Sequence, residues 1–243
     1  MVFLFKLVNR KRKIYLFGWD HVFLKQMESS DQKYVRSLIA EGEHQALDFK
    51  FEISDTRKIA RTLSAFSNTV GGRLLIGVKD NGRIKGVRSD EEYYMVESAA
   101  SLQCKPEVKF KSRNHMIEGK NVLEIYIPQV DLKPVYARDE ENRWMAYVRE
   151  ADQNILASIV QLQVWKEAKK TRGKLLEYTR REEILLGYLE NSPDMPLSKI
   201  QRDTGYNRKE LVTLLTKLVL FDVVEMRFSN GKNIFHLKEA PGQ

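Results

Sequence analysis

Residues 60–82 read ARTLSAFSNTVGGRLLIGVKDNG, and this stretch decides the fold. Before the glycine pair at 71–72, apolar side chains recur at steps of four, three and four, which is the spacing of one helical face. A helix is therefore predicted to begin near residues 54–55 and to stop at the glycines. The apolar positions of this face are Ile59, Leu63, Phe66 and Val70.

The second half of the same stretch predicts a buried strand and a turn. Leu74, Leu75, Ile76 and Val78 form a nearly continuous apolar run, as expected of a strand that is covered on both faces. The Asn81-Gly82 pair favours a hairpin that joins strands at 73–79 and 83–87. A helix followed by such a strand indicates an α+β fold.

Short elements continue on both sides. A strand at 46–51 precedes the helix, and a second helix is expected at 91–102. Further strands are expected at 107–111, 121–128, 135–137 and 144–149, which together predict a mixed sheet. Another helix is expected to start near Asn154, with Ile155, Ile159 and Leu162 facing inward.

The last seventy residues show a different order. Helices are predicted at 180–190, 196–202 and 207–218, and two strands at 223–228 and 233–237. Three helices followed by a hairpin are typical of a small winged helix-turn-helix domain. We therefore expect a first domain at 27–165, a charged linker at 166–178 and the winged helix-turn-helix domain at 179–243.

Basic residues are concentrated at the N-terminus. The net charge is +8, and residues 1–26 contribute +5 of it. These residues keep no sustained periodicity, whereas Met27 precedes a capping sequence at 28–31. We interpret residues 1–26 as a basic extension ahead of a misassigned start, with a functional basic arm as the alternative. Because the rest of the chain is nearly balanced, bulk charge is weak evidence for a nucleic-acid partner.

Several classes of protein are disfavoured. Cys104 is the single cysteine, so no internal disulfide forms, and a cytoplasmic location is expected. No apolar run is long enough to cross a bilayer, so no membrane partner is expected. The glycines at 71–72 end a helix and precede a strand, which is the reverse of a phosphate-binding loop. The four histidines lack metal-ligand spacing and are expected to be surface or core residues.

Three linked motifs resemble the Schlafen AlbA-like domain family. They are residues 43–50 (EHQALDFK), 60–68 (ARTLSAFSN) and 71–82 (GGRLLIGVKDNG), and the resemblance closes at 147–149 (YVR). Two departures stand out: Asp48 occupies a position where glutamate is common, and Glu150-Ala151 replaces a glycine-bearing turn. The resemblance implies a nucleic-acid-binding regulator, or else a metal-dependent nuclease.

In the nuclease alternative, the resemblance assigns catalysis and binding of Mg²⁺ or Mn²⁺ to Glu43, Asp48 and Asp80. Carboxylates that converge on such an ion activate water and offset phosphate charge. Each acid also has a structural explanation. Glu43 ends a helix, Asp48 pairs with Lys50 or Arg73, and Asp80 precedes a turn. The regulator interpretation requires no cofactor and no catalytic activity.

Basic residues in both domains are candidates for phosphate contact. Along the helix at 207–218, Leu211, Leu214, Leu215 and Leu218 define a buried stripe, and polar side chains lie off it. The alternative is a domain used for protein contact. The nucleic-acid-binding residues predicted in the two domains and on the wing are Lys50, Arg73, Arg149, Arg208, Lys209, Thr213, Lys217, Arg227 and Lys232.

The sequence thus predicts a cytoplasmic DNA-binding transcriptional regulator. RNA is the alternative nucleic acid. A homodimer is expected, because the chain carries one AlbA-like unit and dimers suit palindromic operators. The rival functions are a metal-dependent endonuclease and a protein-interaction adaptor.

Overall fold

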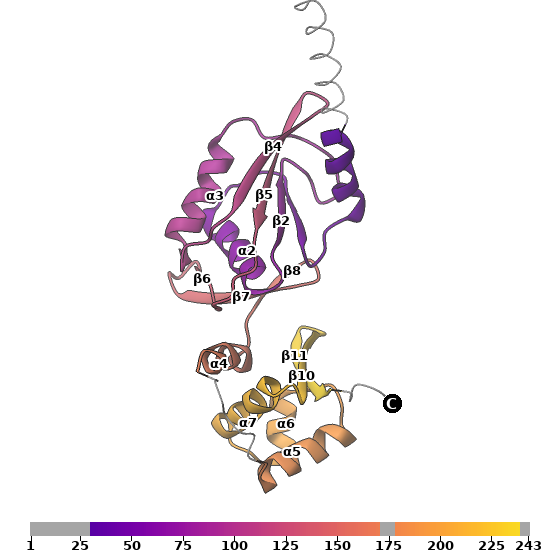
Figure 1. The fold of residues 1–243 in the computed structure, drawn as a ribbon, viewed down its shortest axis with the longest axis vertical. Helices are drawn as coiled ribbons and strands as arrows, with labels where there is room; N and C mark the ends of the chain where they lie inside the picture. The colour runs from indigo at the N-terminus through magenta and orange to yellow at the C-terminus, as the bar shows by residue number, and fades with distance from the viewer. Residues whose placement is uncertain (1–29, 171–177, 239–243) are drawn as a thin grey trace, which may run out of the picture.

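The computed structural model describes residues 30–170 and 178–238 and has a mixed α+β architecture (Figure 1). The predicted extension at 1–26 and most of the predicted linker lie outside the described residues. Residues 30–41 are helical. The other helices are α2 (Thr56–Asn68), α3 (Glu91–Leu102), α4 (Ile159–Ala168), α5 (Arg180–Asn191), α6 (Leu197–Thr204) and α7 (Arg208–Leu220).

The strands form three sheets. The first has the order β1-β2-β5-β4, the second β3-β6-β7-β8, and the third β10-β11-β9. Their bounds are β1 (Leu47–Lys50), β2 (Gly72–Ile76), β3 (Cys104–Lys105), β4 (Lys111–Ile117), β5 (Lys120–Ile127), β6 (Tyr136–Arg138), β7 (Trp144–Glu150), β8 (Gln153–Leu156), β9 (Met195–Pro196), β10 (Val224–Ser229) and β11 (Lys232–Leu237).

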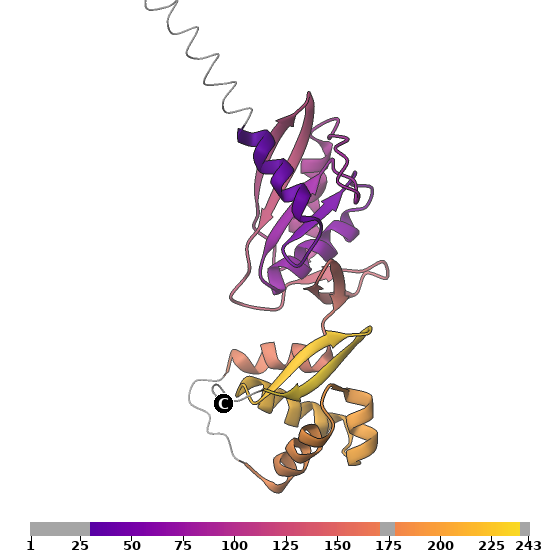
Figure 2. The same cartoon turned by 90° about the vertical axis from the view of Figure 1, so that its right-hand side faces the viewer.

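The central strand β2 is covered on both faces, as its apolar run predicts. Leu74 and Ile76 pack into a core with α2 and α3, whereas Leu75 packs into a second core under the helix at 30–41. Strand β2 pairs in parallel with β1 and antiparallel with β5. Figure 2 shows the helix at 30–41 lying over the outer face of this sheet. The first sheet is therefore sandwiched between helices.

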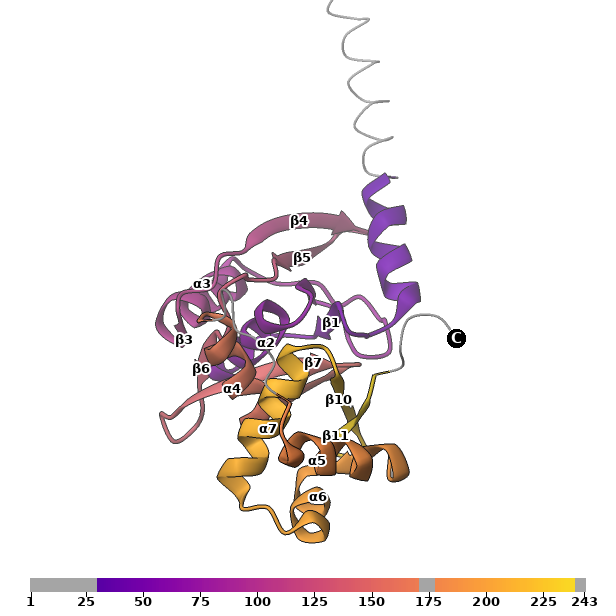
Figure 3. The same cartoon turned by 60° about the horizontal axis from the view of Figure 1, so that its bottom comes forward.

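Helix α2 is the central element of the first core. Asp55 caps its N-terminus by accepting a hydrogen bond from the Arg57 amide at 2.8 Å. The helix lies between the first sheet and strands β6 and β7, as Figure 3 shows. Its apolar side chains and Asn68 are buried between the two sheets. Asn68 fixes the end of α2 to the second sheet, donating to the carbonyls of Val135, just before β6, and of Tyr147 in β7 at 2.8 and 2.9 Å.

The segments around the Asn81-Gly82 turn differ from the predicted hairpin. The turn itself forms, with the Gly82 amide donating to the Lys79 carbonyl at 2.7 Å. Residues 83–87, however, make isolated bridges instead of a strand, Val78 with Ile84 and Val87 with Asn121. The amides of residues 85 and 86 both donate to the Gly77 carbonyl, which turns the chain away from the ladder.

Three other elements differ from expectation. Residues 107–110 form no strand, and β4 begins only at Lys111. Only two side chains of β4 are buried, those of His115 and Ile117, and the others are exposed. The sequence of β4 is therefore too polar for a strand to be predicted from it. The helix expected near Asn154 starts later: residues 153–156 form β8, and the Ser158 hydroxyl accepts from the Gln161 amide to cap α4.

The third core lies at the C-terminal end and contains α5, α6, α7 and the hairpin β10–β11. Helix α4 packs against α7 and contributes the buried Val160 to this core. This differs from the expected division, which placed residues up to 165 in the first domain and 166–168 in a linker. The reason is that α4 turns its apolar face toward α7. In Figure 1, α4 lies between the sheet-rich part and the C-terminal helices.

Candidate nucleic-acid interface

Two of the three predicted nuclease acids lie together beside β1. The Glu43 carboxylate accepts from the Phe49 amide at 2.8 Å. Burial, followed by a hydrogen bond shared with the Asp48 carboxylate, raises the pKa of Glu43. Asp48 is itself 3% exposed. A turn at 43–46 therefore brings these two carboxyl groups together, as their five-residue spacing requires.

Asp80 does not join this pair and lies exposed on the turn after β2. Within residues 30–170 and 178–238, no three His, Cys, Asp or Glu side chains are grouped to hold a metal ion. The predicted set of Glu43, Asp48 and Asp80 is thus not assembled as a metal site. Cations hold Asp48 instead: the Lys50 ammonium lies 2.9 Å from one carboxylate oxygen, which confirms the structural explanation given for this residue.

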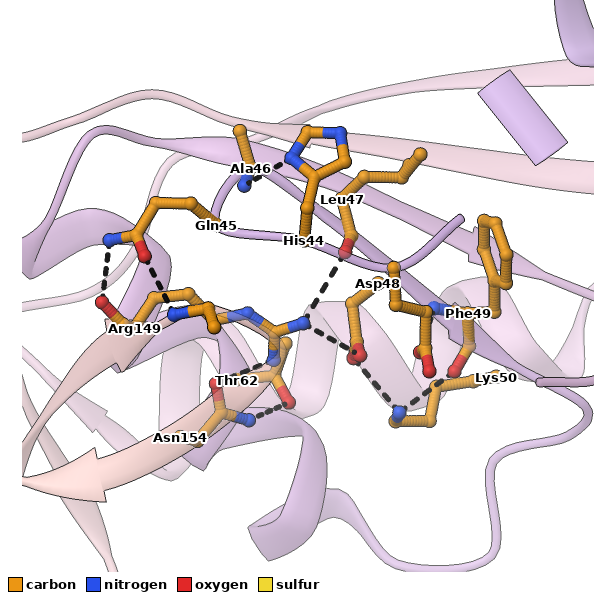
Figure 4. A network of polar contacts seen from close by, with 12 residues as sticks. His44, Gln45, Ala46, Leu47, Asp48, Phe49, Lys50, Thr62, Arg149 and Asn154 are labelled. Atoms are coloured by element: carbon orange, nitrogen blue, oxygen red, sulfur yellow. Dashed lines mark hydrogen bonds and ion pairs between the residues drawn. The ribbon is translucent and has the colours of Figure 1, made fainter. Parts of the chain in front are cut away.

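The second cation on Asp48 is Arg149, which corrects its predicted role in nucleic-acid binding. Arg149 is 2% exposed. Its Nη2 atom donates to Asp48 Oδ1 at 3.1 Å and to the Leu47 carbonyl at 3.3 Å, and Nη1 donates to Asn154 at 3.0 Å. Figure 4 shows the guanidinium enclosed by these partners. Buried and paired in this way, Arg149 joins β7 to β1 and is not available to phosphate.

Lys50 and Arg73 are only partly available. The Lys50 ammonium donates to the Phe49 carbonyl at 2.8 Å in addition to its ion pair. The Arg73 guanidinium donates to Glu124 at 3.0 Å and lies over the Tyr126 ring. The exposed fraction of the side chain is 36% for Lys50 and 41% for Arg73. These residues mainly neutralise buried carboxylates.

Helix α7 presents two exposed cations among the predicted residues, Arg208 and Lys209. The Asn207 side chain accepts from the Glu210 amide at 2.9 Å and caps the helix. Arg208, Lys209 and Thr213 are exposed, as predicted. In the described part of the chain, neither Arg208 nor Lys209 has an acidic side-chain partner. Their positive charges are therefore free to meet an anionic partner.

Farther along α7, other polar residues face the protein. The Lys217 ammonium pairs with Glu182 of α5 at 2.6 Å. Thr216 is 3% exposed and lies on the side of α7 where Val212 is also buried. A second buried face of α7 was not expected from the leucine stripe alone.

The hairpin supplies two further predicted residues. Arg227 is exposed on β10 and pairs with Glu225 at 2.9 Å. Lys232 is exposed beside the turn that joins the strands. A recess of about 360 Å³ is lined by both Arg208 and Lys232, so the start of α7 and the start of β11 face a common space.

Two groups of cations were not predicted as binding residues. Lys85 and Arg88 are exposed in the bridged segment after the Asn81-Gly82 turn, near Lys79 and Arg83. Lys133 is half-buried between the sheets and the C-terminal hairpin. The run of four cations between residues 79 and 88 is visible in the sequence. Nothing in the sequence signals the surroundings of Lys133, because its neighbours come from distant segments.

Comparison with protein families supports the resemblance for the first part of the chain. Residues 43–158 match the family described as Schlafen, AlbA_2. This match confirms the predicted domain type over those residues and relates the chain to nucleic-acid-associated proteins. None of the curated proteins compared with the chain matches it.

The solved structures that are similar to this chain include two bacterial proteins. The DIP2311 protein from Corynebacterium diphtheriae is 18% identical with a TM-score of 0.39, and the match covers 62% of this chain and 30% of that protein. The N-terminal domain of a RecG-related protein from Nitrosomonas europaea is 21% identical with a TM-score of 0.40, covering 61% and 95%. This chain thus spans less than a third of the Corynebacterium protein.

Among residues 30–170 and 178–238, no helix has both the length and the apolar character needed to span a bilayer.

Proposed function

We propose that this protein binds DNA through its C-terminal part and that residues 179–238 form a winged helix-turn-helix. The chain order α5-β9-α6-α7-β10-β11 supports this proposal, because β11 pairs with both β10 and β9 to make a small sheet beside three helices. In such domains the third helix reads the major groove. Helix α7 occupies that position in the chain order, and β10–β11 is the wing.

The observation that carries the proposal is that Arg208 of α7 and Lys232 of β11 line the same recess. Lys209 is exposed next to Arg208, so three cations mark the start of the helix and the wing. A duplex presents closely spaced phosphates, which can meet cations from both elements at once.

The local chemistry of α7 suits this contact. Its first residues carry exposed donors, and the partial positive charge of a helix N-terminus adds to the attraction for phosphate. Thr213 lies one turn beyond Lys209, and its hydroxyl donates to the Lys209 carbonyl at 2.9 Å. Arg208 and Lys209 thus supply charge, and the following turn supplies the surface nearest to base edges.

We further propose a role in transcriptional regulation and a homodimeric state. The basis is the combination of one AlbA-like unit with one DNA-binding unit in each chain, since two copies suit a palindromic site. Sedimentation equilibrium of the full chain tests the dimer. A monomer at concentrations that saturate DNA would contradict it.

The experiment for the proposed function is a fluorescence anisotropy titration with duplex DNA and with RNA of the same sequence. The Arg208→Ala/Lys209→Ala variant should bind DNA more weakly, and the slope of log affinity against log salt should flatten by about 0.9 for each lost phosphate contact. A control with the same charge change is Lys109→Ala/Lys111→Ala, which removes exposed cations from the first domain.

Undiminished DNA binding by a folded Arg208→Ala/Lys209→Ala variant would contradict the assignment. An equal loss of DNA affinity in Lys109→Ala/Lys111→Ala would show that the net charge of the protein, and not the position of Arg208 and Lys209, governs DNA binding. Tighter binding to RNA than to DNA would contradict the proposed choice of nucleic acid.

A further inference from the structure

A second recess lies between the first domain and the C-terminal hairpin. Its volume is about 380 Å³, which is in the size range of small-molecule sites. Its walls come from distant segments: Val70 and Lys133 from the first domain, Trp165 from α4, and Phe228 from β10. The recess lined by Arg208 and Lys232 is its neighbour: Asn233 lines both, and the other lining residues differ.

Lys133 is the distinctive polar group in this recess. Its ammonium donates to the Thr69 carbonyl at 3.3 Å. Among residues 30–170 and 178–238, no carboxylate forms an ion pair with it. Burial lowers the pKa of Lys133, because no neighbouring negative charge offsets the loss of hydration. An ammonium in such surroundings favours an oxyanion as an additional partner.

The other charged residues of the recess do not neutralise Lys133. Arg227 lines the recess and pairs with Glu225 at 2.9 Å. Glu150 also lines the recess but does not lie within ion-pair distance of Lys133. Arg149 also lines the recess, and its guanidinium pairs with Asp48 at 3.1 Å. The charge near Lys133 is therefore positive, and one acid, Glu150, lies elsewhere on the wall.

The rest of the wall is mixed, with amide side chains such as Gln129 and Gln161 beside a group of apolar side chains. Val70, two residues beyond the end of α2, is 57% exposed, and Ile155, Met226 and Phe228 are partly buried around the recess. These apolar side chains beside the ammonium of Lys133 suit a ligand that combines a negative group with a flat apolar body.

We propose that this recess is a binding site for a small aromatic oxyanion, with Lys133 contacting the negative group and apolar side chains of the wall, such as Trp165 and Phe228, contacting the ring. The ligand class is an aromatic carboxylate, sulfonate or phosphate. Because the walls come from both the first domain and β10, a bound molecule contacts both parts of the chain.

The probe for this proposal is 8-anilinonaphthalene-1-sulfonate, an aromatic sulfonate whose fluorescence rises in apolar surroundings. The full-length protein should bind one molecule per chain in a saturable titration. Lys133→Met keeps the length of the side chain and removes the charge, so the dissociation constant should rise about 10-fold or more. If the dye recognised apolar surface alone, the added methionine would leave binding unchanged or strengthen it.

Two further variants complete the test. Lys111→Met, at an exposed site on β4, makes the same chemical change elsewhere and should bind the dye as the unaltered protein does. Val70→Trp adds bulk at the edge of the recess without touching Lys133, and it should abolish saturable binding. It also serves as the decisive variant if circular dichroism shows that Lys133→Met does not fold.

Absence of saturable binding by the unaltered protein would overturn the proposal. Unchanged affinity in folded Lys133→Met or in folded Val70→Trp would overturn it as well. No DNA is present in these titrations, so their outcome is independent of the proposed DNA-binding function.

Discussion

The guanidinium of Arg149 lies 3.1 Å from the carboxylate of Asp48, and both side chains are almost fully buried. The two residues are 101 positions apart and belong to different sheets, β7 and β1. Phe66 of α2 packs against the guanidinium, with 5.1 Å between its ring centroid and the Arg149 Cζ atom. This ion pair thus connects the two sheets at one end of α2.

Replacing Arg149 with methionine should destabilise the protein by about 3 to 5 kcal/mol, because Asp48 would lose its buried cation and keep only the partly exposed Lys50. Urea denaturation of the full chain measures the change. Arg36→Met removes an exposed ion pair with Glu118 and should cost at most about 1 kcal/mol. The double variant Asp48→Leu/Arg149→Met should recover part of the loss. If Arg149→Met lost as little unfolding free energy as Arg36→Met, the buried ion pair would not stabilise the fold.

Gly72→Ala should destabilise the first domain by about 1 to 3 kcal/mol, the usual cost of overpacking a core. A Cβ atom at residue 72 would lie 2.5 Å from the Phe66 ring and 2.9 Å from the Ala46 carbonyl oxygen. Gly187→Ala is the matched control. Residue 187 lies within α5 with open space around it, so alanine should stabilise that helix by about 0.5 to 1 kcal/mol. In thermal melts, Gly72→Ala should lower the melting temperature and Gly187→Ala should raise it. Equal changes in melting temperature would contradict the packing argument.

The stability of the C-terminal part should fall as the pH drops from about 4.5 to about 2. Burial opposes ionisation of Glu182, but hydrogen bonds from Lys217 and Thr179 outweigh it and lower the pKa to about 2. A carboxylate whose pKa is lower in the folded state stabilises the fold above its unfolded pKa, and that contribution is lost as pH falls through the folded value.

The measurement compares melting temperature against pH for the unaltered chain, Glu182→Gln and Glu183→Gln. Glu182→Gln should be less stable near neutral pH and should show a shallower acid dependence. Glu183 is exposed on the same helix turn, so its variant should retain the original dependence. Identical profiles for all three proteins would refute the role of Glu182.

The thiol of Cys104 should not react with thiol reagents in the folded protein at pH 8. Burial raises the pKa of Cys104 to about 12, so the reactive thiolate is scarce and shielded. Labelling should become rapid in urea. Ser101→Cys places an exposed thiol one turn earlier on α3, and that thiol should react at once. Rapid labelling of Cys104 without urea would show that this part of the core opens readily.

The sequence alone determined the elements whose signals are local. The apolar spacing predicted α2, the apolar run at 74–78 predicted a strand covered on both faces, and α3 has the predicted limits. Helix caps such as Asp55 and Asn207 are also local, because the hydrogen bond joins neighbouring residues. The motifs at 43–50, 60–68 and 71–82 predicted the domain type, which the family match over 43–158 confirms.

Tertiary structure decided the features that depend on distant partners. The polar strand β4 forms because β5 pairs along its length, although its own sequence lacks alternation. Helix α4 belongs with α7 because burial of Val160 depends on where the two helices meet. Arg149 matches a family position and carries a charge, yet its role is structural, because folding places Asp48, Leu47 and Asn154 around it. Sequence supplies the charge of a side chain, whereas folding decides whether water, a phosphate or a buried carboxylate neutralises it.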